Sequence, residues 1–560
     1  MNKKWNIIEP DVSIVNRLAE ELRINKIICQ ILANRGIKSS LQAKRFLEAG
    51  LDDLEEPFLI KDMQRAVDRI IQAVSLKEKI LIFSDYDVDG ITSCAILEAQ
   101  LQMMKADFFH YIPHRIKEGY GLNINVVNLA VKRKVRLLIC LDCGICSFNE
   151  IEKLNGYGIQ TIIIDHHTPK EGRLPNAYAI VNPKQKDCPF SFKELAAVGI
   201  VYKLVYCLAK EHKNHYLQLA TLGTVADVVP LLGENRIIVK NGLKHLNQNP
   251  SLGIRALIKE SGLGNKEINP ARISFILAPR INASGRIDSA ELSLGLLTSQ
   301  SEQEAVEIAK NLNQHNRERQ RIGDDILKEA ISLVERNINF KDHYVIVLFK
   351  EDWHVGVLGI VAAKIAERYF RPTIIISLKD GIGKGSGRSI QGFHLYNALS
   401  ECAEYISEFG GHSQAVGLNI PKENIDNFIQ SLNKVAREKI VVDELLPSLN
   451  IDAQLPLGLI NSHLIRQCQL LGPFGIGNPR PLFCTHNLFV KSPPQILGKD
   501  TIKFWVSDGE YTFEAIGFGF KEMAAYLKPK QKVDLAYNLL EDNMASLNPV
   551  ILEIKDIRFD

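Results

Sequence analysis

Three clusters of acidic and imidazole side chains are the residues of this sequence best suited to chemistry. Each cluster directly follows a short apolar run, and together they comprise Asp85, Asp87, Asp89, Asp142, Asp165, His166 and His167. Carboxylates brought together repel one another and are costly to desolvate, and divalent cations are the simplest remedy. A pair of such cations can activate water for hydrolysis. The residue types therefore predict a two-metal hydrolase site.

The apolar runs before these clusters predict the elements that position them. The runs cover residues 79–83, 135–141 and 161–164. Continuous apolar runs of this length are typical of buried parallel strands. Ligands of open α/β sheets bind outside the carboxyl ends of the strands, where the three clusters fall. We therefore expect the clusters to converge at one edge of a parallel sheet.

The acidic clusters also have ordinary structural explanations. Because aspartate is common in turns and at helix N-termini, Asp85, Asp87 and Asp89 could form an acidic turn that ends at Gly90. A calcium loop does not fit, because Ile96 stands where such a loop requires glutamate. The two adjacent histidines could lie in solvent at the surface. These alternatives stay open from the residues alone.

Asp227 is a further candidate, because it lies between Ala226 and the apolar run Val228-Val229-Pro230. An unpaired carboxylate is costly in such surroundings, which favours a ligand role. A buried helix cap is the alternative. Its position after a predicted helix over 216–222 suits either role.

Three cysteines with a C-x-x-C-x-x-C spacing resemble part of an iron–sulfur or zinc site. They are Cys140, Cys143 and Cys146, and Cys188 is the nearest further cysteine that could reach them. Cys140 lies inside an apolar run, where a free thiol behaves as a small apolar side chain. The pattern favours packing cysteines over a cluster.

Composition sets the limits on the class of protein. A chain of 560 residues should divide into three or four domains. Its net charge of +3 is close to neutral, so a nucleic-acid partner would need a locally basic surface. The first residues lack the apolar stretch of a signal peptide, and no run reaches the length of a membrane span. We therefore expect a cytoplasmic protein without a membrane segment, and scattered cysteines fit that reducing compartment.

The order of patterns predicts an α/β fold: two α/β domains joined by a long helix, followed by an all-β module similar to an OB-fold. The expected parts are a helical lead-in over 1–78, a parallel-sheet domain over 79–300, a connecting helix over 301–338, a second α/β domain over 339–440 and the all-β module over 450–560. The aromatic residues of the module are expected mainly in its core, although some could stack on bases; they are Phe504, Trp505, Phe513, Phe518 and Tyr537.

The clusters and several further motifs resemble a known family. The four motifs of the DHH phosphoesterase superfamily are matched in order by Asp85–Ser93, Asp142–Gly144, Asp165–His167 and Gly223–Asp227. Further segments are similar to the RecJ family of bacterial single-strand-specific exonucleases within that superfamily; these are Pro113–Arg115, Glu118–Leu122, Pro279–Arg286, Trp353–Ala362, Phe409–His412 and Gly472–Pro479. The resemblance extends from about residue 50 to the C-terminus. It implies a DHH domain, a DHH-associated domain and a nucleic-acid-binding module.

The resemblance implies a specific set of metal ligands for two ions, Mn²⁺ or Mg²⁺. One ion would lie among Asp89, Asp142, His166 and Asp227. The second would use Asp87 and Asp142, with Asp85 nearby, so that Asp142 bridges the pair. Asp165 is counted with the catalytic residues, and His167 would orient the cluster or touch the scissile phosphate.

The resemblance also implies a set of substrate-binding residues. They are Arg115, Arg280, Asn282, Arg286, His354, Ser386, Arg388 and His412. Arg280 is expected to help hold a 5′-terminal phosphate. We expect Arg280 and Arg286 to lie in a turn, and surface pairing with Asp288 or Glu291 is their alternative. The glycine-rich segment 384–389 is expected either to approach phosphates with its amides or to form a flexible hairpin.

The implied function is a metal-dependent exonuclease that degrades single-stranded DNA from the 5′ end to 5′-mononucleotides in recombination and repair. The expected partners are a single-strand-binding protein and a helicase, and the chain is expected to be a monomer. One alternative is a DHH phosphodiesterase that acts on short oligonucleotides or cyclic dinucleotides. Another is a non-catalytic single-strand-binding scaffold of replication. The complete set of acidic and imidazole residues argues against the scaffold.

Overall fold

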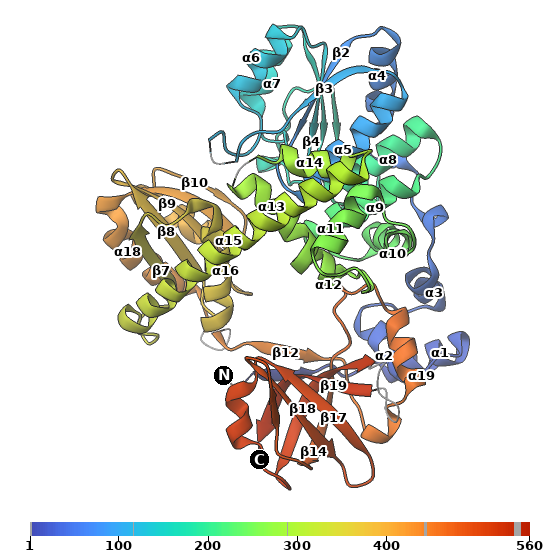
Figure 1. Ribbon diagram of the computed structural model, residues 1–560, viewed down its shortest axis with the longest axis vertical. Helices are drawn as coiled ribbons and strands as arrows, with labels where there is room; N and C mark the ends of the chain where they lie inside the picture. The colour runs from blue at the N-terminus through green and yellow to red at the C-terminus, as the bar shows by residue number, and fades with distance from the viewer. Residues whose placement is uncertain (1–2, 116, 288, 442–444, 542–549, 560) are drawn as a thin grey trace. The chain divides into compact units, whose positions relative to one another are not determined.

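A computed structural model describes the chain at residues 3–115, 117–287, 289–441, 445–541 and 550–559 (Figure 1). The chain forms two compact units. One comprises residues 50–445 and 475–477, and the other comprises 1–49, 446–474 and 478–560. The first unit contains the acidic and imidazole clusters.

A five-stranded parallel sheet forms the first half of the unit at 50–445. Its strand order is β3-β2-β4-β5-β6, and every neighbouring pair is parallel. The strands are β2 (Lys79–Ser84), β3 (Asp107–Tyr111), β4 (Leu137–Leu141), β5 (Gln160–Ile164) and β6 (Ala179–Val181). This sheet confirms the predicted α/β fold with buried parallel strands.

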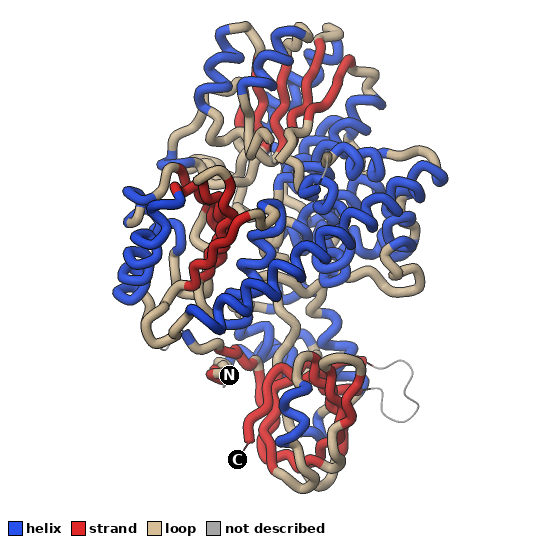
Figure 2. The backbone as a smooth tube through the Cα atoms, turned by 60° about the vertical axis from the view of Figure 1, so that its left-hand side comes forward, coloured by secondary structure: helices blue, strands red, loops and turns tan. Residues whose placement is uncertain are grey.

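Both faces of this sheet are buried, which explains why its strands are continuous apolar runs. Ile80, Ile82 and Ile139 face one core, which also holds α4 (Met63–Ser75), α5 (Val88–Met103), α8 (Ala197–Ala209) and α9 (Asn214–Ala226). Leu81 and Phe83 face a second core with α6 (Ile124–Lys132) and α7 (Phe148–Gly156). The two helix layers lie on opposite faces of the sheet (Figures 1 and 2).

A run of helices continues from this sheet to the next one. It comprises α10 (Gly233–Gln248), α11 (Leu252–Glu260), α12 (Pro270–Arg272), a π-helix (Ile273–Leu277), α13 (Ala278–Ile287), α14 (Glu291–Thr298) and α15 (Glu302–Asn337). The connecting helix expected from the polar-faced pattern is α15, with 36 residues. The turn expected around Arg280 and Arg286 is wrong, because both residues lie on helix α13.

The second sheet of this unit has the order β10-β11-β9-β8-β7, in which only β7 and β8 are parallel. Its strands are β7 (Ile346–Glu351), β8 (Thr373–Lys379), β9 (Ile382–Arg388), β10 (Glu408–Gly411) and β11 (Ala415–Pro421). Helices α16 (Leu358–Tyr369), α17 (Leu395–Glu401) and α18 (Ile425–Lys439) accompany it. This is the expected second α/β domain.

The other unit contains the all-β module. Strand order β13-β14-β18-β19-β17-β16-β15 closes on itself because β14 also pairs with β16. The strands are β13 (Ala453–Gln454), β14 (Phe483–Val490), β15 (Gln495–Leu497), β16 (Thr501–Ser507), β17 (Thr512–Phe518), β18 (Lys532–Glu541) and β19 (Val550–Phe559). Phe504, Phe513 and Tyr537 are buried, as expected, whereas Trp505 and Phe518 are exposed.

The first 78 residues are divided between the two units rather than forming one lead-in. Residues 1–49 contain β1 (Lys4–Ile7), α1 (Val12–Leu22), α2 (Lys26–Asn34) and α3 (Ser40–Glu48), and they share a unit with α19 (Ser462–Leu470) and the β module. Strand β1 pairs in parallel with β12 (Ser448–Ile451). Leu18 and Ile28 share a core with Leu464. Since these partners lie more than 400 residues apart, local sequence patterns cannot show the pairing.

Candidate metal centre

The carboxyl ends of three adjacent strands bring the predicted clusters to one edge of the parallel sheet. Ser84 of β2 is aligned with Leu141 of β4, which is aligned with Ile164 of β5. The next residues along these strands are Asp85, Asp142 and Asp165. Each donates its backbone N–H to the neighbouring strand, with distances of 3.2, 2.9 and 3.3 Å. The sheet register therefore places the three aspartates side by side.

Helix α5 begins inside the first cluster and fixes two more carboxylates. Asp87 caps the helix and accepts hydrogen bonds from the N–H groups of Asp89 (3.0 Å) and Gly90 (3.1 Å). Asp89 lies in the first turn and accepts from the N–H groups of Ala197 and Val198, both at 2.8 Å. Those amides belong to the start of α8, where the helix dipole favours a carboxylate. Both cap hydrogen bonds of Asp87 end on its Oδ1 atom, so Asp87 can cap the helix and also offer an oxygen to a metal ion.

Two backbone outliers lie in the same place. Asp142 has φ 61°, and Val228, directly after Asp227, has φ 64°. The left-handed region is unfavourable for a β-branched residue such as valine. Strained backbone of this kind costs about 1–3 kcal/mol and clusters at functional sites. The two unfavourable backbone conformations thus lie at Asp142 itself and directly after Asp227.

Five buried polar atoms of the cluster have no hydrogen-bond partner within the described part of the chain. They are Asp85 Oδ1, Asp142 Oδ1, Asp227 Oδ2 and both ring nitrogens of His166. His166 Nε2 lies 3.3 Å from Asp142 Oδ1 and 3.6 Å from Asp227 Oδ2. Unsatisfied buried polar atoms are rare and costly, so the grouping of Asp142, Asp227 and His166 Nε2 fits a site that binds a cation.

The ligand atoms fall into three sets, and within each set they lie within 4.8 Å of one another. The sets are Asp85 with Asp87 and Asp142; Asp89 with His166 and Asp227; and Asp142 with His166 and His167. The first two sets share no residue and could each hold one cation. Asp142 belongs to the first of these sets and lies 3.3 Å from His166 Nε2 of the second. Oxygen-rich sets with one imidazole suit Mn²⁺ or Mg²⁺, so the residues fit the expected pair of ions.

The pKa values of the clustered carboxyl groups and of His166 also fit a site that binds divalent cations. Burial and the neighbouring carboxylates raise the pKa of Asp85, Asp142 and Asp227 well above the usual range. They raise the pKa of Asp89 to about 7. Burial lowers the pKa of His166 to about 3, so its imidazole is neutral and can act as a ligand. Cations would allow all of these carboxylates to ionise together.

Asp165 supports the cluster from outside the three ligand sets. It is fully buried, and it accepts hydrogen bonds from His167 Nδ1 (2.7 Å), His167 N–H (3.0 Å) and Ile145 N–H (3.1 Å). Although burial raises the pKa of Asp165, the bonds from His167 outweigh it and lower that pKa to about 2. The ionised Asp165 therefore orients His167.

Tyr120 and His412 also contact the histidine pair. The Tyr120 hydroxyl donates to the backbone oxygen of Asp142 at 3.1 Å and lies 3.3 Å from His167 Nδ1. The His412 ring is stacked on His167, with centroids 6.4 Å apart. Tyr120 was absent from the predicted site, although its motif was visible in the sequence.

Four arginines lie beside the cluster, and three of them surround the half-buried Arg286. Burial, together with Arg115, Arg319 and Arg388, lowers the pKa of Arg286 to about 9. Arg286 Nη1 donates to the backbone oxygen of Gly356 at 3.0 Å. Asp288, one alternative partner, lies outside the described residues, and Glu291 instead accepts from His110 Nε2 at 2.8 Å. We name Arg115, Arg286, Arg319 and Arg388 the arginine group.

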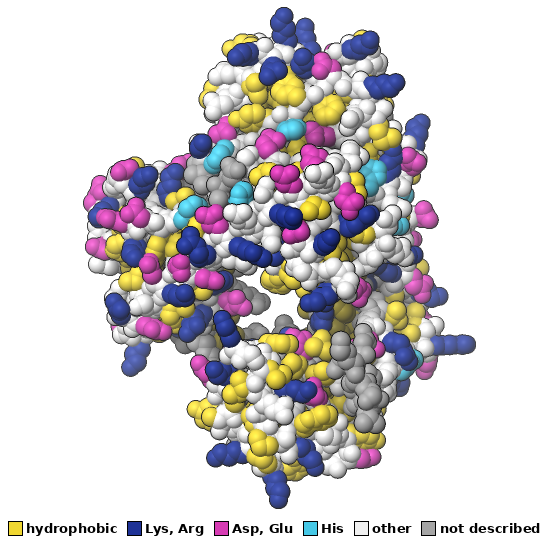
Figure 3. All heavy atoms as spheres, in the orientation of Figure 1, with side chains coloured by type: hydrophobic (Ala, Val, Ile, Leu, Met, Phe, Trp, Pro, Cys, Tyr) yellow, Lys and Arg dark blue, Asp and Glu magenta, His cyan; other side chains and the backbone are white. Residues whose placement is uncertain are grey.

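Arg319 of the arginine group was not predicted from the sequence. It projects from α15, its Nη2 donates to Asn316 at 2.9 Å, and its buried Nε has no partner within the described part of the chain. A basic residue on a long polar helix carries no distinguishing signal. Both basic and acidic side chains occur on the visible face of the molecule, in keeping with the small net charge (Figure 3).

The glycine-rich segment 384–389 is not a phosphate loop or a flexible hairpin, and that expectation is wrong. Most of it belongs to β9, which lies between β8 and β11. A Cβ at Gly385 or Gly387 would lie 3.1 Å or less from side chains of the sheet's core. Ser386 and Arg388 point to the opposite face, where Arg388 Nη1 donates to Ser386 Oγ at 3.4 Å. The glycines therefore serve packing, and the intervening side chains serve the site.

The remaining predicted substrate residues lie on or beside α13. Arg280 donates through Nε to Asn313 (3.0 Å) and through Nη1 to the Ile276 oxygen (2.6 Å). Asn282 is half-buried on the same helix. His354 accepts the Gly356 N–H at 3.2 Å, which places it near Arg286. Arg280 and Arg286 are about 120° apart around the helix, so they point in different directions.

The cysteine spacing does not form a metal site in the described residues. Cys140 and Cys143 are buried and Cys146 is exposed. The three ligand sets contain no cysteine. Cys188 lies elsewhere, where its sulfur accepts the Lys61 N–H at 3.4 Å.

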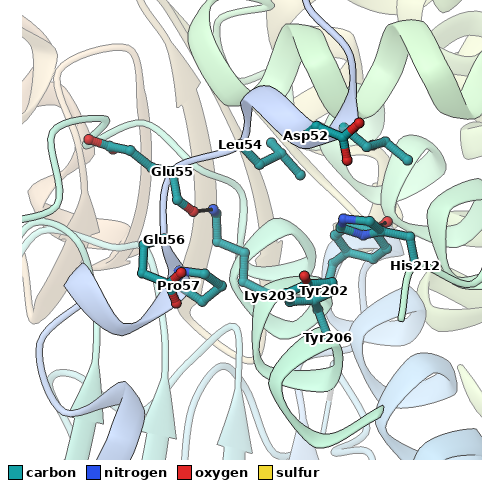
Figure 4. A pocket seen from close by; sticks show the side chains of 10 residues that line it. Asp52, Leu54, Glu55, Glu56, Pro57, Tyr202, Lys203, Tyr206 and His212 are labelled. Atoms are coloured by element: carbon teal, nitrogen blue, oxygen red, sulfur yellow. Dashed lines mark hydrogen bonds between the residues drawn. The ribbon is translucent and has the colours of Figure 1, made fainter. Parts of the chain in front are cut away.

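A separate pocket of about 220 Å³ lies against the later turns of α8 (Figure 4). Tyr202, Lys203 and His212 line it together with residues 51–57. Lys203 Nζ donates to the backbone oxygen of Glu55 at 2.7 Å and lies 2.9 Å from Glu234 Oε2. These contacts hold the segment 51–57 on α8, and none of the candidate ligand sets lies in this pocket.

A parallel sheet with clustered carboxylates and imidazoles at its carboxyl edge, next to a group of arginines, defines a metal-dependent phosphoesterase. Comparison with known proteins refines this class. The matching family models are the DHH family, N-terminal domain, over residues 79–224; the DHHA1 domain over 342–438; and the RecJ OB domain over 451–556. The single-stranded-DNA-specific exonuclease RecJ of Bacillus subtilis is 36% identical, and the match covers 99% of this chain and 70% of that protein.

RecJ of Escherichia coli is 30% identical, and the match covers 92% of each chain. The crystal structure of RecJ from Thermus thermophilus in complex with Mn²⁺ superposes with a TM-score of 0.85 at 26% identity, covering 100% of this chain and 80% of that one. This chain belongs to the RecJ family. Within the described residues, no helix has the length and apolar character that crossing a membrane requires.

Proposed function

We propose that this protein is a metal-dependent exonuclease that degrades single-stranded DNA from the 5′ end and releases 5′-mononucleotides. The observation that supports the proposal most strongly is the pair of ligand sets at one sheet edge, beside the arginine group. The first feature suits hydrolysis of a phosphodiester, and the second suits an anionic polymer. The matched RecJ relatives are named as single-stranded-DNA-specific exonucleases.

The proposed ligands of two divalent ions are Asp85, Asp87 and Asp142 for one, and Asp89, His166 and Asp227 for the other. Such ions, when bound, lower the pKa of water and stabilise the attacking and leaving oxygens of the displacement. Asp142 is a ligand candidate of the first set and lies 3.3 Å from His166 Nε2 of the second, so it would lie between the two ions. Asp165 keeps His167 oriented toward the cluster, and Tyr120 holds the backbone of Asp142.

The arginine group is proposed to hold the terminal phosphate of the strand. Planar guanidinium groups bind phosphate oxygens in pairs, and a 5′-phosphate carries more charge than an internal phosphodiester. Arg286 is half-buried beside other arginines, and a bound anion would offset the repulsion among these cations. Ser386 and Arg388 approach the same place from the second α/β domain. This arrangement would set the 5′ polarity.

Arg388→Met should weaken discrimination between 5′-phosphorylated and 5′-hydroxyl strands by about 10- to 100-fold, because one charge-assisted phosphate contact is worth about 1.5–3 kcal/mol. Methionine keeps much of the buried stem. The measurement is kcat/KM for both ends of an otherwise identical strand. Arg437→Met, at an exposed arginine 3.9 Å from Asp342, is the matched control and should keep full discrimination. An unchanged ratio in Arg388→Met would remove Arg388 from the phosphate site.

Digestion of single strands that carry a label at either end tests the proposed function. With Mn²⁺ present, the 5′ label should appear first, as a mononucleotide, and a chelator should stop the release. Early release of the 3′ label, or indifference to metal, would overturn the proposal. A dinucleotide in place of the strand tests the small-substrate alternative. If Asp89→Ala still degrades the strand at the wild-type rate, the proposed ligand set is wrong.

The setting of this activity is a further part of the proposal. A nuclease of single strands needs a source of such strands, which a helicase supplies and a single-strand-binding protein coats. On that reasoning we propose these two partners. We also propose that the enzyme is a monomer and is located in the cytoplasm. Co-sedimentation with each purified partner would test the associations, and absence of binding would contradict them.

A further inference from the structure

We infer that Phe275 stacks against a base of the bound single strand. This inference rests on the proposed function, and it concerns a residue outside the predicted site. Phe275 is 80% exposed, the largest exposed fraction among the large apolar side chains that the structure describes as exposed. Burying a phenylalanine is worth about 1.5–3 kcal/mol, so such exposure gives up stability.

The backbone around Phe275 is unusual. Residues Ile273–Leu277 form a π-helix between α12 and α13, closed by a bond from Ala278 N–H to the Ile273 oxygen. Ile273 and Leu277 are fully buried, while Phe275 lies between them in sequence and faces outward. Single π-helical turns inside α-helical segments occur frequently at functional sites. The irregular turn displays an aromatic ring at a position where core packing does not require it.

Hydrogen bonds of the residues on either side of Phe275 connect this π-helical turn to the segment before Asp227 and to Arg280. The Ser274 hydroxyl donates to the Val225 oxygen at 3.4 Å, two residues before the ligand candidate Asp227. On the other side, Arg280 Nη1 donates to the oxygen of Ile276 at 2.6 Å. Burial, together with Arg317 and with Arg319 of the arginine group, lowers the pKa of Arg280. The turn that carries Phe275 is thus held between the segment that leads to Asp227 and the predicted phosphate-binding Arg280.

An exposed aromatic ring close to basic residues is suited to bind a nucleobase. Proteins that bind single strands place aromatic rings beside basic residues, because each base offers a flat face and each nucleotide a phosphate. A duplex keeps its bases stacked inside, where an exposed ring cannot reach them. Stacking on Phe275 would therefore favour an unpaired strand of any sequence over a duplex. It would also hold the strand between successive cleavage steps.

Photocrosslinking gives a direct test. Single strands carrying 5-iododeoxyuridine at one of about a dozen positions from the 5′ end are bound to the full protein with metal chelated and then irradiated. At one position or two adjacent ones, the wild-type protein should crosslink at Phe275, identified by mass spectrometry. Crosslinks at every position that avoid Phe275 would overturn the inference.

Steady-state kinetics provide the second test. Phe275→Ala should raise KM for a long strand by about tenfold and leave kcat and dinucleotide hydrolysis within about twofold, since one stacking contact is lost. Phe275→Trp should restore KM. Tyr157→Ala is the matched control, because Tyr157 is 62% exposed on the same unit and follows α7, at the opposite edge of the sheet from the clusters. An unchanged KM in Phe275→Ala overturns the inference, whereas a wild-type protein that degrades no strand overturns the proposed function itself.

Discussion

Replacing Asp142 with asparagine should reduce the rate of strand hydrolysis by about a thousandfold or more, because even residues outside the ligand shell cost about 10- to 100-fold when removed. Asp142 belongs to two of the three ligand sets, and its carboxyl is 2% exposed. Asparagine has almost the same shape and tolerates the left-handed backbone at φ 61°. The loss would therefore reflect charge and not shape. The measurement is single-turnover hydrolysis at saturating Mn²⁺.

The same substitution should raise the stability of the metal-free protein. Burial and neighbouring carboxylates raise the pKa of Asp142 above its ordinary value of 3.8. A carboxyl whose pKa is raised on folding stabilises the protein only while it is protonated, and that contribution disappears as the pH rises through the raised pKa. At pH 8 the metal-free Asp142→Asn variant should thus melt at a higher temperature than the wild type.

Mn²⁺ should reverse the order of the melting temperatures of the wild type and Asp142→Asn. A ligand that binds only the folded state stabilises it in proportion to the logarithm of its concentration above Kd. Mn²⁺ should therefore raise the melting temperature of the wild type strongly and that of Asp142→Asn much less. Asp187→Asn is the control, because Asp187 is an exposed aspartate on the same unit that is 2.7 Å from Lys61. An equal Mn²⁺-induced shift in wild type and Asp142→Asn would show that Asp142 is not a ligand.

The strands that carry the site could be predicted because both of their faces are buried. The runs at 79–83 and 161–164 differ from β2 and β5 by one residue, since apolar side chains are needed on either face of this sheet. Once the strands are parallel, their ends fall at one edge, and the aspartates after them must meet there. Chain order and register therefore bring Asp85, Asp142 and Asp165 together, whereas the expected set of metal ligands came from the family resemblance.

The parts that could not be predicted depend on contacts between distant segments. Asn282 and Gly285 suggested a turn between Arg280 and Arg286, but all four residues lie on helix α13. A Cβ at Gly285 would lie 3.2 Å from the backbone oxygen of Tyr86, so this glycine allows a close approach within the fold. Glycines in β9 looked flexible because the side chains that crowd them come from other strands. Arg319 was missed for the same reason, since only the folded chain brings it to Arg286.

Gly90→Ala should abolish most activity and lower the free energy of unfolding by about 1–3 kcal/mol, the usual range for overpacking a buried site. A Cβ on Gly90 would lie 2.4 Å from the backbone oxygen of Asp85 and 2.8 Å from its carbonyl carbon. Backbone atoms cannot rotate away as a side chain can. The start of α5 would have to move from the end of β2, and that start carries Asp87 and Asp89.

The control for Gly90→Ala is another glycine within a helix. Gly323 of α15 has nothing within 4 Å of the position that a methyl group would take, so Gly323→Ala should stabilise the protein by about 0.5–1 kcal/mol through helix propensity. The melting temperature should therefore rise in Gly323→Ala and fall in Gly90→Ala, and only Gly90→Ala should lose strand hydrolysis. A displacement of about 1 Å at the ligands is enough to cost about 100-fold in rate. If Gly90→Ala melted and reacted like the wild type, the tight approach of α5 to β2, on which the proposed arrangement of carboxylates depends, would be wrong.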